Sequence, residues 1–360
     1  MNFAEVRRDA IAGALLGTAV GDSLGLPREG LSPKRAQRLF GGAPLRHRLV
    51  LGRGFGSDDT EHACMVAQAL LAFPEEPADF ARSLGWRLRG WLLGLPAGVG
   101  WATLRAIVKL WLGFPPGRSG VVSAGNGPAM RSPLLGVCLA QQPERLEAFV
   151  RASSRLTHRD ARAEQGALAI ALAAAHGATH GAAGVDAEAV MREWETRLHE
   201  PALREALATV SACWRRGASV PELAAALGLE HGVSGYVLHT VPVVLYAWLR
   251  HPSDFRRAVE EVILLGGDTD TTGAIVGALV GATVGASGIP TEWVQGIAEW
   301  PRTTGWLLQL ADRLASRFAE AGTLAAPGPL PLFWPGLIPR NLAVLGIVLW
   351  HGFRRLLPPY

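Results

Sequence analysis

Hydrophobic residues in this chain recur mainly at intervals of three and four positions, the spacing that places side chains on one face of an α-helix. The stretches with the clearest spacing are residues 63–73, 134–139, 165–175, 222–227, 237–248 and 307–318. No stretch alternates convincingly between hydrophobic and polar residues as a half-buried strand would. We therefore predict an all-α domain of many helices, joined by glycine- and proline-rich loops such as residues 113–128 and 176–184.

Glycine also recurs at intervals of four residues in two distant places. The positions are Gly13, Gly17, Gly21 and Gly25, and then Gly273, Gly277, Gly281 and Gly285. On a helix such residues form a nearly continuous groove, into which a neighbouring backbone can pack closely. We interpret both series as close helix packing, and we expect the residues at the ends of these helices to matter most.

Two apolar segments raise the question of membrane insertion. Residues 271–291 carry no charge over 21 positions, but glycine, alanine, serine and threonine fill most of them, which favours a tightly packed buried helix. Residues 342–350 form a segment of nine residues, which is too short to span a bilayer. We therefore expect no transmembrane segment.

The composition is that of a globular protein with a large core. Of the 360 residues, 49% are hydrophobic and 18% are charged. The net charge is +4, but the arginines are spread along the chain without a dense run or a nucleic-acid-binding motif, so nucleic acid is not expected as the main partner. Three widely spaced cysteines argue against a disulfide framework or a thiolate metal site, and predict a reducing, cytoplasmic location.

The C-terminal part of the sequence differs from the rest. Five prolines within residues 325–339 indicate an extended linker, and an apolar segment that ends in two arginines follows. We divide the chain into a domain at 1–322, a linker at 323–340 and a short apolar helix at 341–360. This tail could dock on the domain, join a partner or lie on a membrane surface, and docking is the interpretation we favour.

Two acidic clusters each precede a predicted helix: Ser57-Asp58-Asp59-Thr60 and Asp268-Thr269-Asp270-Thr271. Such side chains can cap a helix N-terminus, which is one interpretation. One cap needs only one side chain, however, and neighbouring carboxylates repel each other, which suggests a compensating cation. Carboxylates and hydroxyls without thiolates or a histidine pair favour Mg²⁺ or Mn²⁺ over zinc. If the two clusters meet in the fold, they form a binuclear site that can activate water and orient an oxygen-rich substrate.

Six short motifs follow one another between residues 8 and 300. They are Gly21-Asp22-Ser23-Leu24-Gly25 with Glu29, Ser57-Asp58-Asp59-Thr60, Gly125-Asn126-Gly127 with Met130-Arg131, Thr157-His158, Gly235-Tyr236-Val237, and Gly266-Gly267-Asp268-Thr269-Asp270-Thr271 with Gly277. In these motifs and their order the chain resembles the ADP-ribosylglycohydrolase family. Each motif alone is weak, but six in order are highly specific.

The resemblance implies an all-α enzyme that releases ADP-ribose from an ADP-ribosylated protein or a small ADP-ribose conjugate, with two Mg²⁺ or Mn²⁺ ions in a cleft. It assigns the metal ligands to two groups: Ser57, Asp58 and Asp59, and Asp268, Asp270 and Thr271. These four aspartates and Glu29 would form the catalytic centre, where Glu29 could protonate the leaving group. The implied substrate contacts are Asn126, His158, Tyr236 and the backbone of Gly125 and Gly127, which could cradle the pyrophosphate. For His158 and Tyr236, a structural histidine and a core aromatic residue are the alternatives.

Two other functions are compatible with part of the sequence. The first motif also reads as a GDSL esterase signature with Ser23 as nucleophile, but that chemistry needs a strand before the serine and leaves Asp268 and Asp270 unexplained. A relative that only binds ADP-ribose, or serves structurally, would be expected to have lost metal ligands, whereas every expected carboxylate is present. The sequence does not distinguish arginine, serine and acyl linkages.

The first motif also bears on the N-terminus. Arg7 and Arg8 precede the apolar residues 10–20 and resemble an export signal. Cleavage after Val20 would remove the helix that presents residues 21–29. We therefore interpret residues 7–20 as the first helix of the domain, in a protein that stays in the cytoplasm.

Overall fold

The computed structural model describes residues 3–319 and 327–358, and within these ranges every extended regular element is a helix. The α-helices of the described chain are α1 (Phe3–Gly25), α2 (Pro33–Phe40), α3 (Asp58–Ala72), α4 (Pro77–Leu93), α5 (Trp101–Trp111), α6 (Pro116–Ser119), α7 (Gly127–Met130), α8 (Pro133–Cys138), α9 (Pro143–Arg155), α10 (Ala161–His180), α11 (Ala187–Arg197), α12 (Pro201–Arg215), α13 (Val220–Ala226), α14 (Val237–Arg250), α15 (Phe255–Ile263), α16 (Thr269–Val284), α17 (Thr291–Gly296), α18 (Thr304–Arg317) and α19 (Leu337–Arg354). Short 3₁₀ turns are η1 (Leu26–Arg28), η2 (Ala182–Gly184), η3 (Ala286–Gly288) and η4 (Trp334–Gly336). The predicted all-α class is confirmed.

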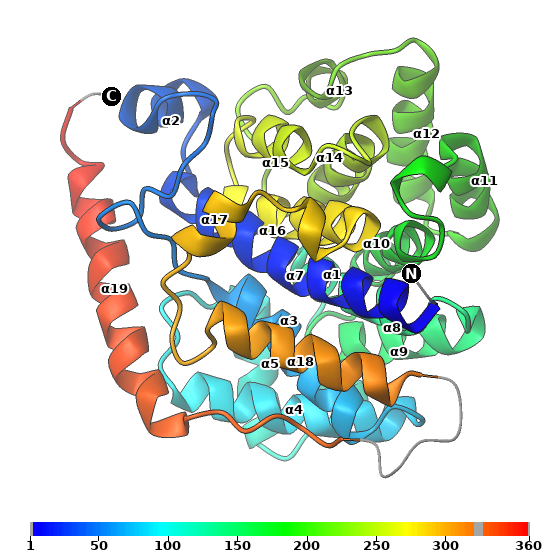
Figure 1. Ribbon diagram of the computed structural model, residues 1–360, viewed down its shortest axis with the longest axis vertical. Coiled ribbons are helices and arrows are strands. Elements are labelled where there is room, and N and C mark those ends of the chain that lie inside the picture. The colour runs from blue at the N-terminus through cyan, green and yellow to red at the C-terminus, as the bar shows by residue number, and fades with distance from the viewer. Residues whose placement is uncertain (1–2, 320–326, 359–360) are drawn as a thin grey trace.

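Helices α1 and α16 pack antiparallel at the centre of the molecule (Figure 1), and their glycines allow the close approach. Gly17 faces Gly277, and Gly21 faces Gly273. A Cβ atom on Gly17 or Gly21 would stand 2.1 Å or 1.9 Å from the opposite carbonyl oxygen, so no larger residue fits. The packing expected of both glycine series is confirmed, and it brings the C-terminal end of α1 beside the N-terminal end of α16.

Other helices cover this central pair. Helix α18 lies along α1, α10 and α15 pack on α16, and α3 contacts α1. Two helices are long and apolar enough to cross a membrane by length and composition. In the first, Arg7–Arg28, an apolar stretch of 18 residues is entirely buried in the protein; in the second, Trp334–Arg354, 28% of the corresponding stretch is buried.

One predicted loop is helical instead. The glycines at 176–184 predict a break, but α10 continues to His180. A Cβ atom on Gly177 would stand 2.2 Å from the Thr283 hydroxyl oxygen on α16. This glycine therefore permits close packing between two helices and does not end α10.

The segment before α16 is fixed by its backbone. Gly267 forms isolated bridges with Leu31 and Val233, and its φ angle is +85°. A Cβ atom there would stand 2.1 Å from the Val233 carbonyl oxygen, so the position requires glycine. The next residue, Asp268, donates its backbone N–H to the same carbonyl at 2.6 Å. The start of α16 is thereby held in place.

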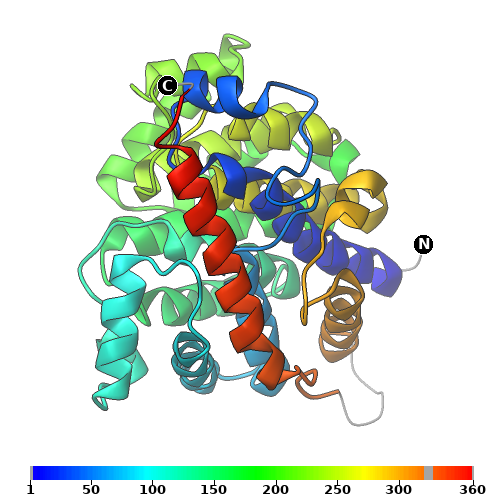
Figure 2. The same ribbon diagram turned by 90° about the vertical axis from the view of Figure 1, so that its left-hand side faces the viewer.

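The C-terminal helix α19 crosses one face of the domain (Figure 2). The predicted domain boundary at residue 322 lies outside the described residues. The helix begins at Leu337, earlier than the expected residue 341, because Pro339 occupies its first turn, where proline is tolerated. Leu337, Arg340 and Val344 are buried, so one side of α19 is docked on the domain.

Candidate active site

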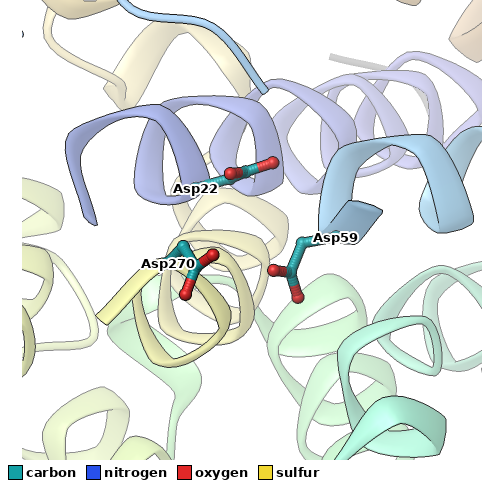
Figure 3. A group of neighbouring side chains, drawn as sticks. All are labelled: Asp22, Asp59 and Asp270. Carbon is teal, nitrogen blue, oxygen red and sulfur yellow. The ribbon is translucent and has the colours of Figure 1, made fainter. Parts of the chain in front are cut away.

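Three buried aspartates from distant parts of the chain converge where α1, α3 and α16 meet (Figure 3). Asp22 comes from the last turn of α1, and Asp59 and Asp270 come from the first turns of α3 and α16. Each offers one carboxylate oxygen, and these three oxygens lie within 4.8 Å of one another. The two acidic clusters therefore meet, as a shared metal site requires.

Asp270 lines a cavity of about 1020 Å³, whereas Asp22 and Asp59 are fully buried and are not among its lining residues. The predicted site residues that line it are Glu29, Ser57, Asp58, Gly125, Asn126, Gly127, His158, Asp268, Asp270 and Thr271. Small-molecule sites commonly measure roughly 300–1,000 Å³. The cavity therefore has room for a ligand at the large end of this class.

Asp22 connects α1 to the start of α3. Its carboxylate accepts hydrogen bonds from the backbone N–H groups of Ser57 and Thr60 at 2.8 and 3.1 Å, and from the Thr60 hydroxyl at 2.5 Å. Burial nevertheless raises the pKa of Asp22 to about 6, because loss of hydration outweighs these hydrogen bonds. The N-terminus of α3 is thereby positioned by a residue from a different helix.

Helix capping explains Ser57 but not Asp268. The Ser57 hydroxyl accepts from the Asp59 backbone N–H at 3.3 Å and caps α3. Asp268 occupies the N-cap position of α16 but makes no capping hydrogen bond with its side chain. Its Oδ2 accepts from the Asn126 side-chain amide at 2.7 Å. Asn126 therefore orients a carboxylate that lines the cavity.

The charges of the cluster fit a bound cation. Asp59 Oδ1 is buried without a hydrogen-bond partner, whereas its Oδ2 accepts from the hydroxyls of Ser57 and Thr271. Burial, followed by the charges of neighbouring carboxylates, raises the pKa values of Asp59, Asp58 and Asp270 well above their usual range. A divalent cation would relieve this repulsion, and the oxygen donors suit Mg²⁺ or Mn²⁺.

Comparison with known proteins decides the family. A sequence model described as ADP-ribosylglycohydrolase matches residues 4–323. The chain belongs to the ADP-ribosylglycohydrolase family. The resemblance drawn from the six motifs is thus confirmed, and the protein is a hydrolase of ADP-ribose linkages.

Relatives of this ADP-ribosylglycohydrolase cover most of its length. A protein of Archaeoglobus fulgidus described as uncharacterized is 30% identical over 292 residues, 79% of this chain and 90% of that protein. The ADP-ribosyl-[dinitrogen reductase] glycohydrolase of Rhodospirillum rubrum is 27% identical over 298 residues, 79% of this chain and 89% of that protein. A solved structure described as an ADP-ribosylglycohydrolase-related protein complex aligns with a TM-score of 0.65 and 31% identity, over 86% of this chain and 98% of that one.

The site of this ADP-ribosylglycohydrolase contains a carboxylate that the sequence does not single out. In the sequence, Asp22 is recognisable only as part of the first motif, because no second acidic residue stands beside it. The available signal is a lone charge in the apolar part of α1, residues 10–25, all of which are buried. A carboxylate in such a helix needs a partner, because an unpaired buried charge is costly.

His158 and Tyr236 lie in different surroundings. His158 lines the cavity beside Gly125 and Gly127, and its Nδ1 is 2.9 Å from the Thr157 hydroxyl. Burial, and then the charge of Arg131, lowers the pKa of His158 to about 3, so its ring is neutral. Tyr236 is not among the cavity-lining residues, and its hydroxyl accepts a hydrogen bond from Arg162 at 3.0 Å. Its predicted contact with substrate stays a prediction.

Ser23 lacks the surroundings of an esterase nucleophile. It lies within helix α1, is fully buried, and donates its hydroxyl to the Val20 carbonyl oxygen at 3.1 Å. The strand that a nucleophile elbow requires is replaced by a helical turn. This geometry excludes the esterase alternative.

Proposed function

We propose that this protein uses two Mg²⁺ or Mn²⁺ ions to hydrolyse the glycosidic bond between ADP-ribose and a protein side chain or a small acceptor. The observation that carries the proposal is the convergence of Asp22 and Asp59 on Asp270, which lines the cavity. The charges that raise the pKa values of Asp59 and Asp270 are all those of other carboxylates. A cation is the missing counter-charge.

The proposed metal ligands come from three helices and the turns before them. They are Asp22, Ser57, Asp58, Asp59, Asp268, Asp270 and Thr271. When bound, the ions supply Lewis acidity, which fixes ribose hydroxyls and lowers the pKa of a bound water. The chain prepares this site by hydrogen bonds: Asn126 orients Asp268, and Asp22 holds the backbone of Ser57.

Glu29 is proposed to hold the proton that the leaving group needs. Its side chain lines the cavity after the turn that follows α1. Partial loss of hydration, and then the charge of Asp268, raises its pKa above the usual range. A glutamic acid that keeps its proton at higher pH can donate it to the departing nitrogen or oxygen of the conjugate.

The substrate is proposed to extend from this centre towards the loop at residues 125–127. The backbone N–H groups of Gly125 and Gly127 would bind the pyrophosphate, whereas that of Asn126 already donates to the Gly235 carbonyl oxygen at 2.9 Å. The neutral ring of His158 packs against Gly125 and Gly127 and supports the loop. A cytoplasmic location is also proposed, with support from the free, buried thiols of Cys64, Cys138 and Cys213.

The test is release of free ADP-ribose from arginine-, serine- and acetyl-linked ADP-ribose, with Mg²⁺, with Mn²⁺ and with EDTA. The wild type is compared with Asp268→Asn plus Asp270→Asn. The matched control, Asp186→Asn plus Asp254→Asn, removes two aspartates that cap α11 and α15 outside the cavity. We expect release by the wild type and the control, and loss in the first double variant and in EDTA.

Other outcomes discriminate between the alternatives. Release that survives EDTA would overturn the metal-dependent mechanism. Binding of ADP-ribose without cleavage of any conjugate would indicate a non-catalytic ADP-ribose-binding protein instead.

A further inference from the structure

Helix α19 lies beyond the matched family region yet lines the cavity. The family match ends at residue 323, and α19 spans Leu337–Arg354. Three of its residues, Arg340, Val344 and Val348, line the cavity together with the predicted metal ligands. They recur at intervals of four, so they form one stripe along the helix.

Arg340 holds the turn that precedes the α3 ligands. Its guanidinium donates to the Gly56 carbonyl oxygen at 2.7 Å and to the two Glu299 oxygens at 2.8 and 2.5 Å. Glu299 in turn accepts from the Gly56 backbone N–H at 3.0 Å. Both polar backbone groups of Gly56 are therefore bound by this ion pair, directly before Ser57 and Asp58.

The ion pair belongs to a buried group of four charged side chains. Glu61, on α3, lies 2.7 Å from Arg302 and 3.5 Å from Arg340, and it also accepts from the Trp91 indole. The four charged side chains are each no more than 5% exposed. Buried ion groups of this kind hold one geometry only while every member is present.

The other end of α19 reaches the Glu29 turn. Arg355, the residue after the helix, donates to the carbonyl oxygens of Pro27 and Glu29 at 2.8 and 2.7 Å. A helix rises 1.5 Å per residue, so Arg340 and Arg355 are separated by roughly 22 Å along the helix. One helix thus contacts the backbone on both sides of the site.

We propose that α19 completes the active site of this enzyme. Arg340 is a positioning residue that holds the Gly56–Asp59 segment in the geometry that binds metal. Val344 and Val348 form an apolar wall against the bound conjugate and thereby restrict which conjugates fit. The inference rests on the proposed function, because the metal and the conjugate are those named there.

The positioning role is tested by titrating Mn²⁺ into the full-length protein in a calorimeter. Arg340→Lys keeps a positive charge beside Glu299 but loses the planar fork that also reaches Gly56. Arg145→Lys is the control outside this ion group, since Arg145 also reaches both a carboxylate, that of Glu75, and a carbonyl oxygen, that of Pro74, and does not line the cavity. We expect Arg340→Lys to weaken Mn²⁺ binding by about tenfold and Arg145→Lys to leave it within about twofold, with every titration run below the melting temperatures of all three proteins. Equal Mn²⁺ affinity in wild type and Arg340→Lys would overturn the positioning role.

The wall is tested with ADP-ribose as the probe, in the presence of saturating Mn²⁺. Val348→Trp adds bulk to a residue that lines the cavity, whereas Leu349→Trp changes its exposed neighbour. We expect Val348→Trp to weaken ADP-ribose binding by about tenfold without changing Mn²⁺ affinity, and Leu349→Trp to change neither. Equal ADP-ribose affinity in wild type and Val348→Trp would overturn the wall. Wild-type protein that binds neither probe would overturn the proposed function itself, and wild-type binding with unchanged variants would overturn only the role of α19.

Discussion

Asp22 shows how one side chain connects packing with chemistry. It sits in a helix that touches its partner through glycines, and its oxygens reach both the backbone of α3 and the neighbouring aspartates. Asparagine at this position would keep the size and one acceptor oxygen but remove the charge.

We expect Asp22→Asn to lower Mn²⁺ affinity and ADP-ribose release by about 10–100-fold, because a carboxylate in contact with the metal site is lost. Calorimetry with Mn²⁺ and a release assay measure both effects. Asp9→Asn is the control on the same helix, since Asp9 accepts from the Ala286 backbone N–H far from the cavity. Unchanged Mn²⁺ affinity in Asp22→Asn would remove Asp22 from the metal site.

The lowered pKa of His158 predicts how the free energy of unfolding changes in acid. Its folded-state pKa of about 3 lies below the usual 6.5, because burial disfavours the charged ring. A lowered pKa means that the unfolded chain binds the proton more readily, so this stabilising contribution is complete above pH 6.5 and is lost as the pH falls towards 3. At pH 4.5 the loss is on the order of 3 kcal/mol.

The variant His158→Gln lacks this proton site. Urea unfolding at pH 7, 6, 5 and 4.5 should therefore show a steeper loss of stability in the wild type than in the variant. Parallel curves for the two proteins would mean that His158 is not held neutral in the fold.

At the scale of elements, the α1–α16 contact fixes the distance between Asp22 and Asp270. Gly17→Ala would place a methyl group 2.1 Å from the Gly277 carbonyl oxygen, and the helices would have to separate. We expect a loss of about 3 kcal/mol in unfolding free energy, together with weaker Mn²⁺ binding. Gly346→Ala is the matched control, since Gly346 lies within α19 with open space around it and alanine should be neutral or stabilising there. Equal urea midpoints for Gly17→Ala and the wild type would show that the contact tolerates a side chain.

Sequence patterns predicted those parts of the fold and site that depend on local chemistry. The glycine series predicted close packing, and the paired acidic clusters predicted a shared site, because each signal lies within a few neighbouring residues. The glycines at 176–184, in contrast, wrongly predicted a loop. Glycine is needed at Gly177 because Thr283 on another helix packs against it. Arg340 could not be found in this way, because its role depends on Gly56 and Glu299, which only the tertiary fold brings to it.

At the scale of the whole molecule, the C-terminal residues are part of the structure that supports the site. Leu330 exchanges two hydrogen bonds with the Gln68 side chain on α3, at 2.7 and 2.8 Å. Further along, Arg340 neutralises Glu299. A chain that ends at residue 326 would leave Gln68 unpaired and Glu299 without its cation. The central helices would remain, but the start of α3 would lose its support.

We therefore expect this truncation to cost about 3–5 kcal/mol of stability, the usual effect of removing one partner from a buried ion pair. Mn²⁺ binding should weaken with it, which calorimetry and thermal melting can follow on the same samples. The control keeps α19 and changes only its exposed face, by Leu342→Ser and Leu349→Ser, and should melt like the wild type. A truncated protein that melted and bound Mn²⁺ like the full chain would show that the domain at 1–322 holds its metal ligands unaided. If Mn²⁺ binding weakens at temperatures where the truncated protein is still folded, α19 is needed to keep the metal ligands in their binding geometry.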